Sequence, residues 1–176
     1  KQLPPITCAL GPPCDAAALS GAVEAGKRGL IVPILIGPEA KIRAVAAEEG
    51  IDLAPYQIVP VEHSHAAAAK AVELARSGHV EGLMKGSLHT DELMGAIVPS
   101  ATGLRTARRI SHVFVMDVPT YPRLLMVTDA AVNIFPTLEE KADILQNAID
   151  LAHALGIAEV RVAVLSAMET INSKVP

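Results

Sequence analysis

The chain has no tryptophan, and two phenylalanines and two tyrosines are the only aromatic residues among its 176. Proteins that stack on the bases of single-stranded nucleic acid need aromatic side chains, so this scarcity argues against that class. The hydrophobic fraction is nevertheless 51%, and the core must therefore consist of Ala, Val, Ile and Leu. Buried aliphatic runs of this kind are typical of the parallel strands of layered α/β proteins.

The chain also lacks a large excess of either charge, because 15 basic and 19 acidic residues give a net charge of only −4. No global positive field favours nucleic acid or an anionic membrane. The apolar runs are broken by Pro or Gly and fall short of the roughly 20 residues that span a bilayer. The N-terminus does not have the pattern of a secretory signal. We expect a cytoplasmic protein that binds neither nucleic acid nor membranes.

Cysteine is scarce as well. Cys8 and Cys14 are the only two, and their spacing fits neither a zinc site nor a disulfide framework. We expect free thiols in a reducing compartment. His63 and His65 are two positions apart, which on a helix directs them away from each other, so no metal site is predicted. The GxSxG, Walker lysine and GxGxxG motifs are absent.

Strand-like and helix-like segments alternate over the first hundred residues. The predicted strands are Ile6–Leu10, Leu30–Gly37, Gln57–Val61 and Glu81–Lys85, and the predicted helices are 15–28, 38–49 and 63–77. Asp15 is placed to cap the first helix, and Pro38 to occupy the first position of the second. Pro33 suggests a bend or an edge position in its strand. This alternation predicts an α/β fold with a parallel sheet and helices on both faces.

The pattern changes near residue 110. The strand candidates Ser111–Val118 and Leu124–Thr128 are separated by only "PTYPR", which is too short for a helical crossover and predicts an antiparallel hairpin. Thr137 and Glu140 then form a capping-box pattern at the start of a helix that Gly156 ends.

A further strand is predicted at residues 160–167. A parallel layer would continue beyond it, so we expect residues 1–107 to form a first α/β domain and residues 108–176 the start of a second, incomplete one.

The segment "KGSLHT", residues 85–90, is the first candidate site, because it follows a predicted strand. Ligands of open α/β sheets bind at the carboxyl ends of the strands. Lys85 supplies charge, Gly86 permits close approach of the backbone, and Ser87, His89 and Thr90 supply hydrogen-bond donors. Two acidic residues in the next helical turn already satisfy the helix dipole, so an anion is expected over residues 85–89. The alternative is an ordinary loop in which Thr90 caps the helix.

Arg105, Arg108 and Arg109 form the second candidate. Guanidinium groups grip multiply charged ligands through paired hydrogen bonds, whereas a solvated basic edge is the alternative. Asp129 and Asn133 follow a predicted strand end and form a third candidate. A turn-forming Asx pair explains those two residues equally well.

Long segments of the chain resemble the phosphate acetyl/butyryltransferase family. They are "LMKGSLHTDELMGAIV", "GLRTARRISHVFVMDVPTYP", "VTDAAVNIFPTLEEKADILQNAIDLAHALGI" and "RVAVLSAMETIN". The similarity is greatest to the acyltransferase part of proteins described as bifunctional enoyl-CoA hydratase/phosphate acetyltransferases, and a fused hydratase domain is therefore possible. It runs from "PPCDAAALSGA" to the last residue.

The resemblance implies two α/β domains around a cleft, related to isocitrate and isopropylmalate dehydrogenases. It implies reversible acyl transfer between coenzyme A and inorganic phosphate, with acyl-CoA and phosphate as substrates, a homodimer, no metal and no tightly bound cofactor. By position, Ser87, His89 and Thr90 match the catalytic loop, which is expected to face the cleft, with Lys85 as a nearby charge.

Three departures from the family pattern bear on this assignment. Acetyl-specific members carry an arginine roughly where Gly95 stands, so the acyl chain length is left open, and the arginines at 105–109 are candidates to substitute. Relatives often have His where this chain has Pro12. The family's Ser-Arg pair and nearby Asp, one of them the expected base, belong to a C-terminal portion that this sequence does not contain.

Two other functions remain open at this point. A nicotinamide-dependent decarboxylating dehydrogenase on the same fold would need a carboxylate cluster for its metal. The other is a non-catalytic module that binds coenzyme A.

Overall fold

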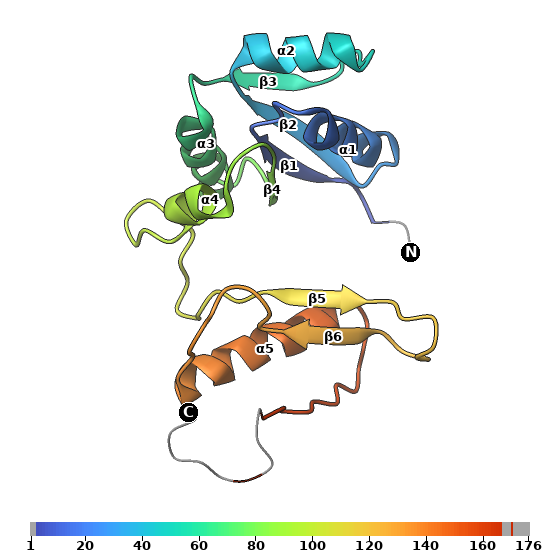
Figure 1. Cartoon of the computed structure of the whole chain (residues 1–176), viewed down its shortest axis with the longest axis vertical. Coiled ribbons are helices and arrows are strands. Elements are labelled where there is room, and N and C mark those ends of the chain that lie inside the picture. The colour runs from blue at the N-terminus through green and yellow to red at the C-terminus, as the bar shows by residue number, and fades with distance from the viewer. Residues whose placement is uncertain (1–2, 167–169, 171–176) are drawn as a thin grey trace. The chain divides into compact units, whose positions relative to one another are not determined.

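The computed structural model describes residues 3–166 and residue 170. The chain forms two compact units, residues 1–105 and residues 106–176, and each is described by itself (Figure 1). Among the described residues, no helix combines the length and the apolar character needed to cross a membrane.

A four-stranded parallel sheet forms the centre of the first unit. Its strands are β1 (Ile6–Gly11), β2 (Ile31–Gly37), β3 (Gln57–Pro60) and β4 (Gly82–Lys85), in the order β3-β2-β1-β4. Ile6 pairs with Ile31 at one end of β1, and Gly11 pairs with Lys85 at the other. The predicted parallel sheet is confirmed.

Four helices connect and follow these strands: α1 (Ala16–Lys27), α2 (Glu39–Glu48), α3 (Ser64–Arg76) and α4 (Thr90–Ile97). Asp15 caps α1 as predicted, because its carboxylate accepts a hydrogen bond from the backbone N–H of Ala18. Gly29, Gly50 and Gly78 follow the ends of α1, α2 and α3 and have φ angles of 69°, 65° and 75°, a left-handed conformation that suits glycine.

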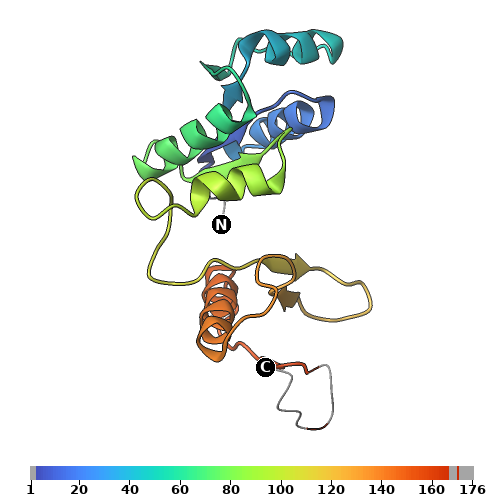
Figure 2. The same cartoon turned by 60° about the vertical axis from the view of Figure 1, so that its left-hand side comes forward.

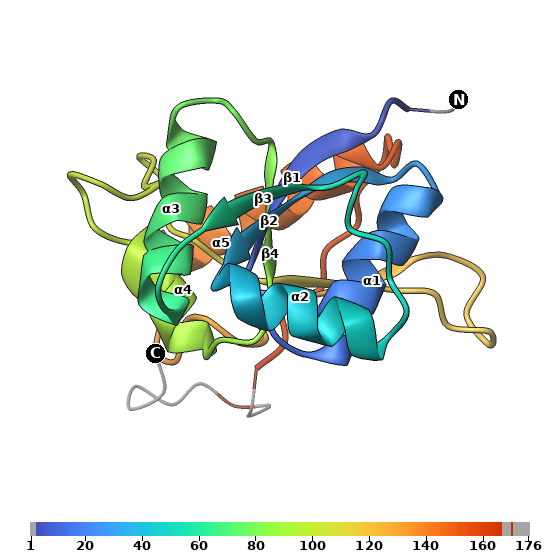
Figure 3. The same cartoon turned by 90° about the horizontal axis from the view of Figure 1, so that it is seen from above.

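Apolar cores lie on both faces of the sheet. Leu10 and Leu35 pack against Leu19 of α1 and Ile42 of α2 on one face. The other face carries a second core with residues of α3, beside which α4 packs (Figures 2 and 3). Burial of one such leucine contributes roughly 1.5–3 kcal/mol, so the helices fix the loops that join them to the strands.

The second unit contains a hairpin and one long helix. The strands β5 (Val113–Met116) and β6 (Leu125–Thr128) pair antiparallel, which confirms the predicted hairpin, and α5 (Leu138–Ala154) packs against β6. The predicted capping box is also present. The Glu140 carboxylate accepts the Thr137 backbone N–H at 2.9 Å, and the Thr137 hydroxyl accepts the Glu140 N–H at 3.3 Å.

Two local predictions about the proline residues are corrected. Pro33 lies in an interior strand and not at an edge; β3 begins to pair with β2 only at Ile34, so no ladder partner lies beside Pro33 on that side. Pro38 is the N-cap of α2 and not its first helical residue.

The strand predicted at residues 160–167 is wrong over its described part. Residues 160–166 are not a strand, because they pair with neither β5 nor β6, and an extended segment becomes a strand only through a hydrogen-bonded partner. Ala167 lies outside the described residues.

Candidate functional site

Two loops meet at the carboxyl edge of the sheet in the first unit. β1 lies between β2 and β4. The chain leaves β1 for α1 on one face, whereas it leaves β4 for α4, which packs against α3 on the opposite face. Loops that diverge in this way at a reversal of strand order open a crevice, which is where open α/β sheets bind ligands.

The backbones of the two loops are joined by hydrogen bonds. The Gly86 N–H donates to the Gly11 carbonyl at 2.9 Å, and the Ser87 N–H donates to the Pro12 carbonyl at 2.7 Å. A Cβ atom at position 86 would lie 2.2 Å from the Pro12 oxygen. Gly86 is therefore required by the approach of the neighbouring loop, whereas the sequence suggested approach of a ligand.

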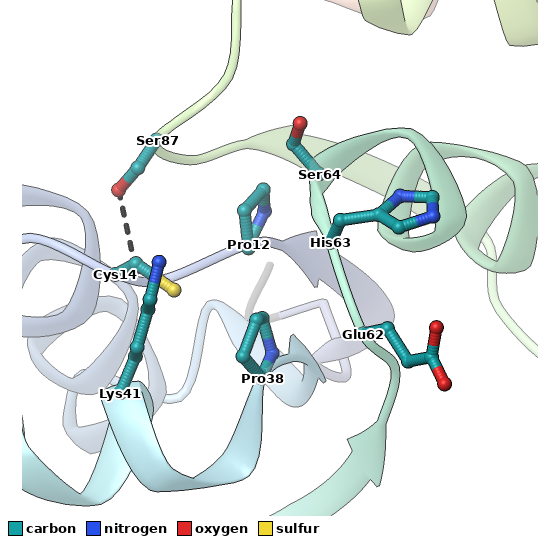
Figure 4. A pocket seen from close by; sticks show the side chains of 8 residues that line it. All are labelled: Pro12, Cys14, Pro38, Lys41, Glu62, His63, Ser64 and Ser87. Atoms are coloured by element: carbon teal, nitrogen blue, oxygen red, sulfur yellow. Dashed lines mark hydrogen bonds between the residues drawn. The ribbon is translucent and has the colours of Figure 1, made fainter.

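The hydroxyl of Ser87 links its loop to the start of α1. It accepts a hydrogen bond from the Cys14 N–H at 3.1 Å (Figure 4) and donates one to the Asp15 carboxylate. The hydrogen bond from Ser87 is the main cause that holds the pKa of Asp15 below its ordinary value, and the bond from the Ala18 N–H adds to it. Asp15 therefore stays ionised beside the loop.

Lys85 and Leu88 fix the middle of the loop. Lys85 Nζ donates to the Leu88 carbonyl at 2.8 Å, and the Leu88 side chain is buried. An ammonium group has three donors, and hydrogen-bond partners within the described residues occupy one of them, so Lys85 has two donors with which it can bind an anion.

His89 and Thr90 lie where the loop becomes α4, and both residues are exposed. The alternative in which Thr90 caps the helix is wrong. His89 is the extended N-cap residue, and Thr90 is the first helical residue. The capping carboxylate belongs to Glu92, which accepts the His89 N–H at 2.8 Å. In the described part of the chain, no hydrogen bond engages the Thr90 hydroxyl, so it is available to a ligand.

Glu92 also connects α4 to the start of α3. Its carboxylate accepts the Ser64 hydroxyl at 2.7 Å and lies 3.0 Å from Nδ1 of His65. The hydrogen bond from Ser64, followed by that from the His89 backbone, lowers the pKa of Glu92.

The loop borders an open hollow of about 600 Å³. Its lining residues come from the starts of α1 and α3 and from the segment that runs from the end of β4 into α4: Asp15, Ser64, Lys85, Gly86, Ser87, Leu88, His89 and Glu92. A second hollow of about 290 Å³ is lined by Pro12, Cys14, Pro38, Lys41, Glu62, His63, Ser64 and Ser87 (Figure 4). The sequence singled out residues 85–90 but missed Asp15, Ser64 and Glu92 as site neighbours. The position of two of them in the sequence could have indicated this, because Asp15 and Ser64 each follow a parallel strand whose carboxyl end lies at this edge.

Two of the three candidate arginines form ion pairs inside the second unit. Arg108 lies 2.5 Å from the Asp150 carboxylate. Arg109 lies 2.7 Å from the Glu140 carboxylate and donates to Asn133 Oδ1 at 2.8 Å. Arg105 is exposed and is the last residue of the first unit. A ligand grip by all three stays a prediction, and two of them already have protein partners.

Asp129 and Asn133 form a turn. Asp129 accepts the backbone N–H groups of His112 at 3.1 Å and of Asn133 at 2.9 Å, together with the Asn133 side-chain amide. Burial alone raises the pKa of Asp129, but these hydrogen bonds together outweigh it and lower the pKa. The bonds are those of the Asx pair considered as an alternative, and contact of the pair with substrate stays a prediction.

Both cysteines are free thiols. Burial is the main cause that raises the pKa of each, so neither is an activated nucleophile. Over residues 3–166 and residue 170, no group of three or more His, Cys, Asp or Glu side chains gathers where it could hold a metal ion.

Comparisons with known proteins agree on one family. Residues 64–176 match the model of the family described as "Phosphate acetyl/butaryl transferase". The chain is 63% identical to a phosphate acetyltransferase of Rhizobium meliloti over 98% of the chain and 54% of that protein. It is 38% identical to a phosphate butyryltransferase of Clostridium acetobutylicum over 92% of the chain and 54% of that protein.

The fold is similar to that of a solved branched-chain phosphotransacylase from Enterococcus faecalis V583. The TM-score is 0.73 at 25% identity, over 97% of this chain and 59% of the other. The chain spans about half the length of the curated relatives that it matches.

Proposed function

The chain belongs to the phosphate acetyl/butyryltransferase family, and on that premise we propose that the full-length protein transfers an acyl group reversibly between coenzyme A and inorganic phosphate. In the direction of acyl-CoA synthesis, the thiolate of coenzyme A attacks the carbonyl carbon of an acyl phosphate. The new C–S bond replaces the C–O bond, and inorganic phosphate leaves. The thiol proton passes to a base that the family resemblance places in a C-terminal portion outside this sequence.

One observation carries the assignment of the acyl-phosphate site to residues 85–90. Residues 85–89 border a hollow of about 600 Å³ at the point where the strand order of the sheet reverses. This position is where open α/β sheets bind ligands. The position of this hollow at the sheet edge supports the assignment, and its volume leaves room for an acyl phosphate.

The exposed groups of this loop suit the chemistry of acyl transfer. We assign Lys85 to the phosphate charge, and His89 and Thr90 to the phosphate oxygens and to the negative charge that grows on the carbonyl oxygen. Donors held in advance at such positions stabilise the transition state more than the ground state. Gly86 and Ser87 shape the loop between them.

The remaining candidate contacts are part of the same proposal. Arg105 has the most available guanidinium group, because it has no hydrogen bond or ion pair within the described residues. Arg108 and Arg109 would have to exchange their carboxylate partners for substrate oxygens. Asp129 and Asn133 are proposed as further substrate contacts near β6.

Several finer features belong to the same proposal. They are the domain division at residues 107 and 108, a fold related to the isocitrate and isopropylmalate dehydrogenases, a homodimer, a cytoplasmic location, and coenzyme A as a substrate and not a resident cofactor. A fused hydratase domain belongs with them. The dehydrogenase activity considered as an alternative is not favoured by the relatives.

The test is to mix full-length protein with phosphate and acetyl-, propionyl- or butyryl-CoA, and to measure acyl phosphate and free thiol together. We expect the two products in equal amounts, and the ratio of kcat/KM values gives the preferred chain length. Protein that binds coenzyme A and forms neither product would instead be a binding module.

A further inference from the structure

We propose that Asp15 is a positioning residue of the acyl-phosphate site and acts through the hydroxyl of Ser87. The inference rests on the proposed function and deepens it. It assigns a role to a residue outside the loop, and it moves Ser87 from a direct contact with substrate to a support.

The Ser87 hydroxyl uses its single proton within the protein. That proton is donated to Asp15, and the oxygen at the same time accepts the Cys14 N–H at 3.1 Å. A hydroxyl group has one donor, so Ser87 has none left for a phosphate or carbonyl oxygen. Its two bonds instead hold its loop against the loop after β1.

The Asp15 carboxylate is hydrogen-bonded both to helix α1 and to the loop. One carboxylate oxygen accepts the Ala18 N–H at 2.7 Å in the first turn of α1, and the other accepts Ser87. Helix α1 is fixed in turn by Leu19 and Val23, which are buried in the core. The Asp15 carboxylate therefore transmits the position of a packed helix to the loop.

The rest of the loop is also held in place by the protein. Residue 88 is buried, and the N–H of His89 is held by Glu92 at 2.8 Å. Asp15 fixes the near end of the loop and Glu92 fixes the far end. These two anchors leave little freedom to Lys85 and His89, which line the hollow, and to the adjacent Thr90. A misplacement of about 1 Å in such groups can lower a rate about 100-fold.

The experiment compares Asp15→Asn, Ser87→Ala and the double variant in full-length protein. Asn caps a helix about as well as Asp, so Asp15→Asn keeps the cap of α1, but its amide presents hydrogens to Ser87 where an acceptor is needed. Thr137→Ala is the matched control, because it weakens the cap of α5 and has no bond to the loop.

We expect kcat/KM for acetyl phosphate to fall about tenfold to 100-fold in each single variant, with the KM for coenzyme A unchanged. The double variant should be no worse than either single one, because both remove the same link. Thr137→Ala should lower the melting temperature and leave kcat/KM unchanged. A variant that only lost stability would not lower kcat/KM for acetyl phosphate while leaving the KM for coenzyme A unchanged.

Amide hydrogen exchange gives a readout that does not need activity. Peptides that cover residues 12–15 and 86–89 should exchange faster in both single variants, since the Cys14 and Ser87 N–H groups lose their fixed geometry. Wild-type kcat/KM in both variants, or losses that multiply in the double variant, would overturn the inference. If the wild-type protein forms no acyl phosphate, the proposed function fails, and exchange alone decides: faster exchange supports the link, and unchanged exchange overturns it.

Discussion

At the scale of single residues, the site combines one lysine with two carboxylates that would repel an anion if they were left without partners. Asp15 and Glu92 each accept hydrogen bonds from a serine hydroxyl and from backbone N–H groups, and their pKa values are lowered. These donors stabilise the negative charges on the two carboxylates. Two donors of Lys85 and the hydroxyl of Thr90 have no partner among the described residues and are left for a ligand.

The first prediction concerns the pKa of Asp15, which we expect to rise toward its ordinary value in Ser87→Ala because the main lowering cause is removed. Titration of the carboxyl carbon by NMR measures it. A lowered folded-state pKa stabilises the protein above the ordinary Asp pKa, and this contribution is lost as the pH falls through the lowered value. The stability difference between wild type and variant should therefore shrink in acid.

Ser64→Ala is the matched control for that titration. It removes the hydroxyl bonded to Glu92 and should raise the pKa of Glu92 while Asp15 is unaffected. An Asp15 pKa that is the same in wild type and in Ser87→Ala would show that the bond between them does not hold in solution.

The second prediction concerns Gly86→Ala. The added Cβ would lie 2.2 Å from the Pro12 oxygen and 2.7 Å from the Pro12 carbonyl carbon, and backbone atoms cannot yield cheaply. We expect unfolding in urea to show a loss of about 1–3 kcal/mol, the usual range for overpacking. Gly95→Ala in α4 is the control. It meets nothing within 4 Å and should stabilise the helix by about 0.5–1 kcal/mol. Equal effects of the two substitutions would contradict the close approach of the loops.

At the scale of elements, the ends of the helices are determined locally. Asp15 before α1, Thr137 and Glu140 at α5, and glycines after the last turns could all be predicted from the sequence, because each acts within about four residues of itself. The start of α4 could not. His89 and Thr90 are adjacent, and the choice between them as N-cap depends on a loop held by Gly11 and Pro12 from another strand.

The third prediction is that Thr137→Ala destabilises α5 by about 1 kcal/mol, the usual cost of losing an N-cap side chain. Thr137→Ser keeps the hydroxyl and should cost little, and thermal unfolding followed by circular dichroism compares the two. A Thr137→Ala variant as stable as Thr137→Ser would mean that the bond to the Glu140 N–H, 3.3 Å long, contributes nothing.

The segment at residues 160–166 shows the limit of local reasoning for strands. Val160, Val162 and Val164 alternate with other residues as in a strand, and a strand prediction from composition was correct for β5 and β6. Those two strands pair with each other across a short turn, whereas residues 160–166 have no partner in that sheet. Whether a segment forms a strand therefore depends on its neighbours as well as on its own sequence.

At the scale of the whole molecule, the parallel class of the sheet followed from the alternation of strands and helices. The strand order β3-β2-β1-β4 did not, because several orders satisfy the same alternation. That order places residues 12–15 beside residues 86–89, and so it decides which side chains share a site. The loop at residues 85–90 could therefore be singled out as a candidate from the sequence, but its neighbours from other loops, and the bond between Ser87 and Asp15, could not.

The central claim is that residues 85–90 hold the acyl phosphate, and His89→Ala in full-length protein tests it most directly. Loss of one donor that acts in the transition state lowers turnover about 100-fold to 1,000-fold. The exposed His89 side chain contributes little to the core, so the melting temperature should stay close to that of the wild type. The account predicts a folded protein that turns over poorly with acetyl phosphate and coenzyme A. A folded His89→Ala protein with normal turnover would contradict it.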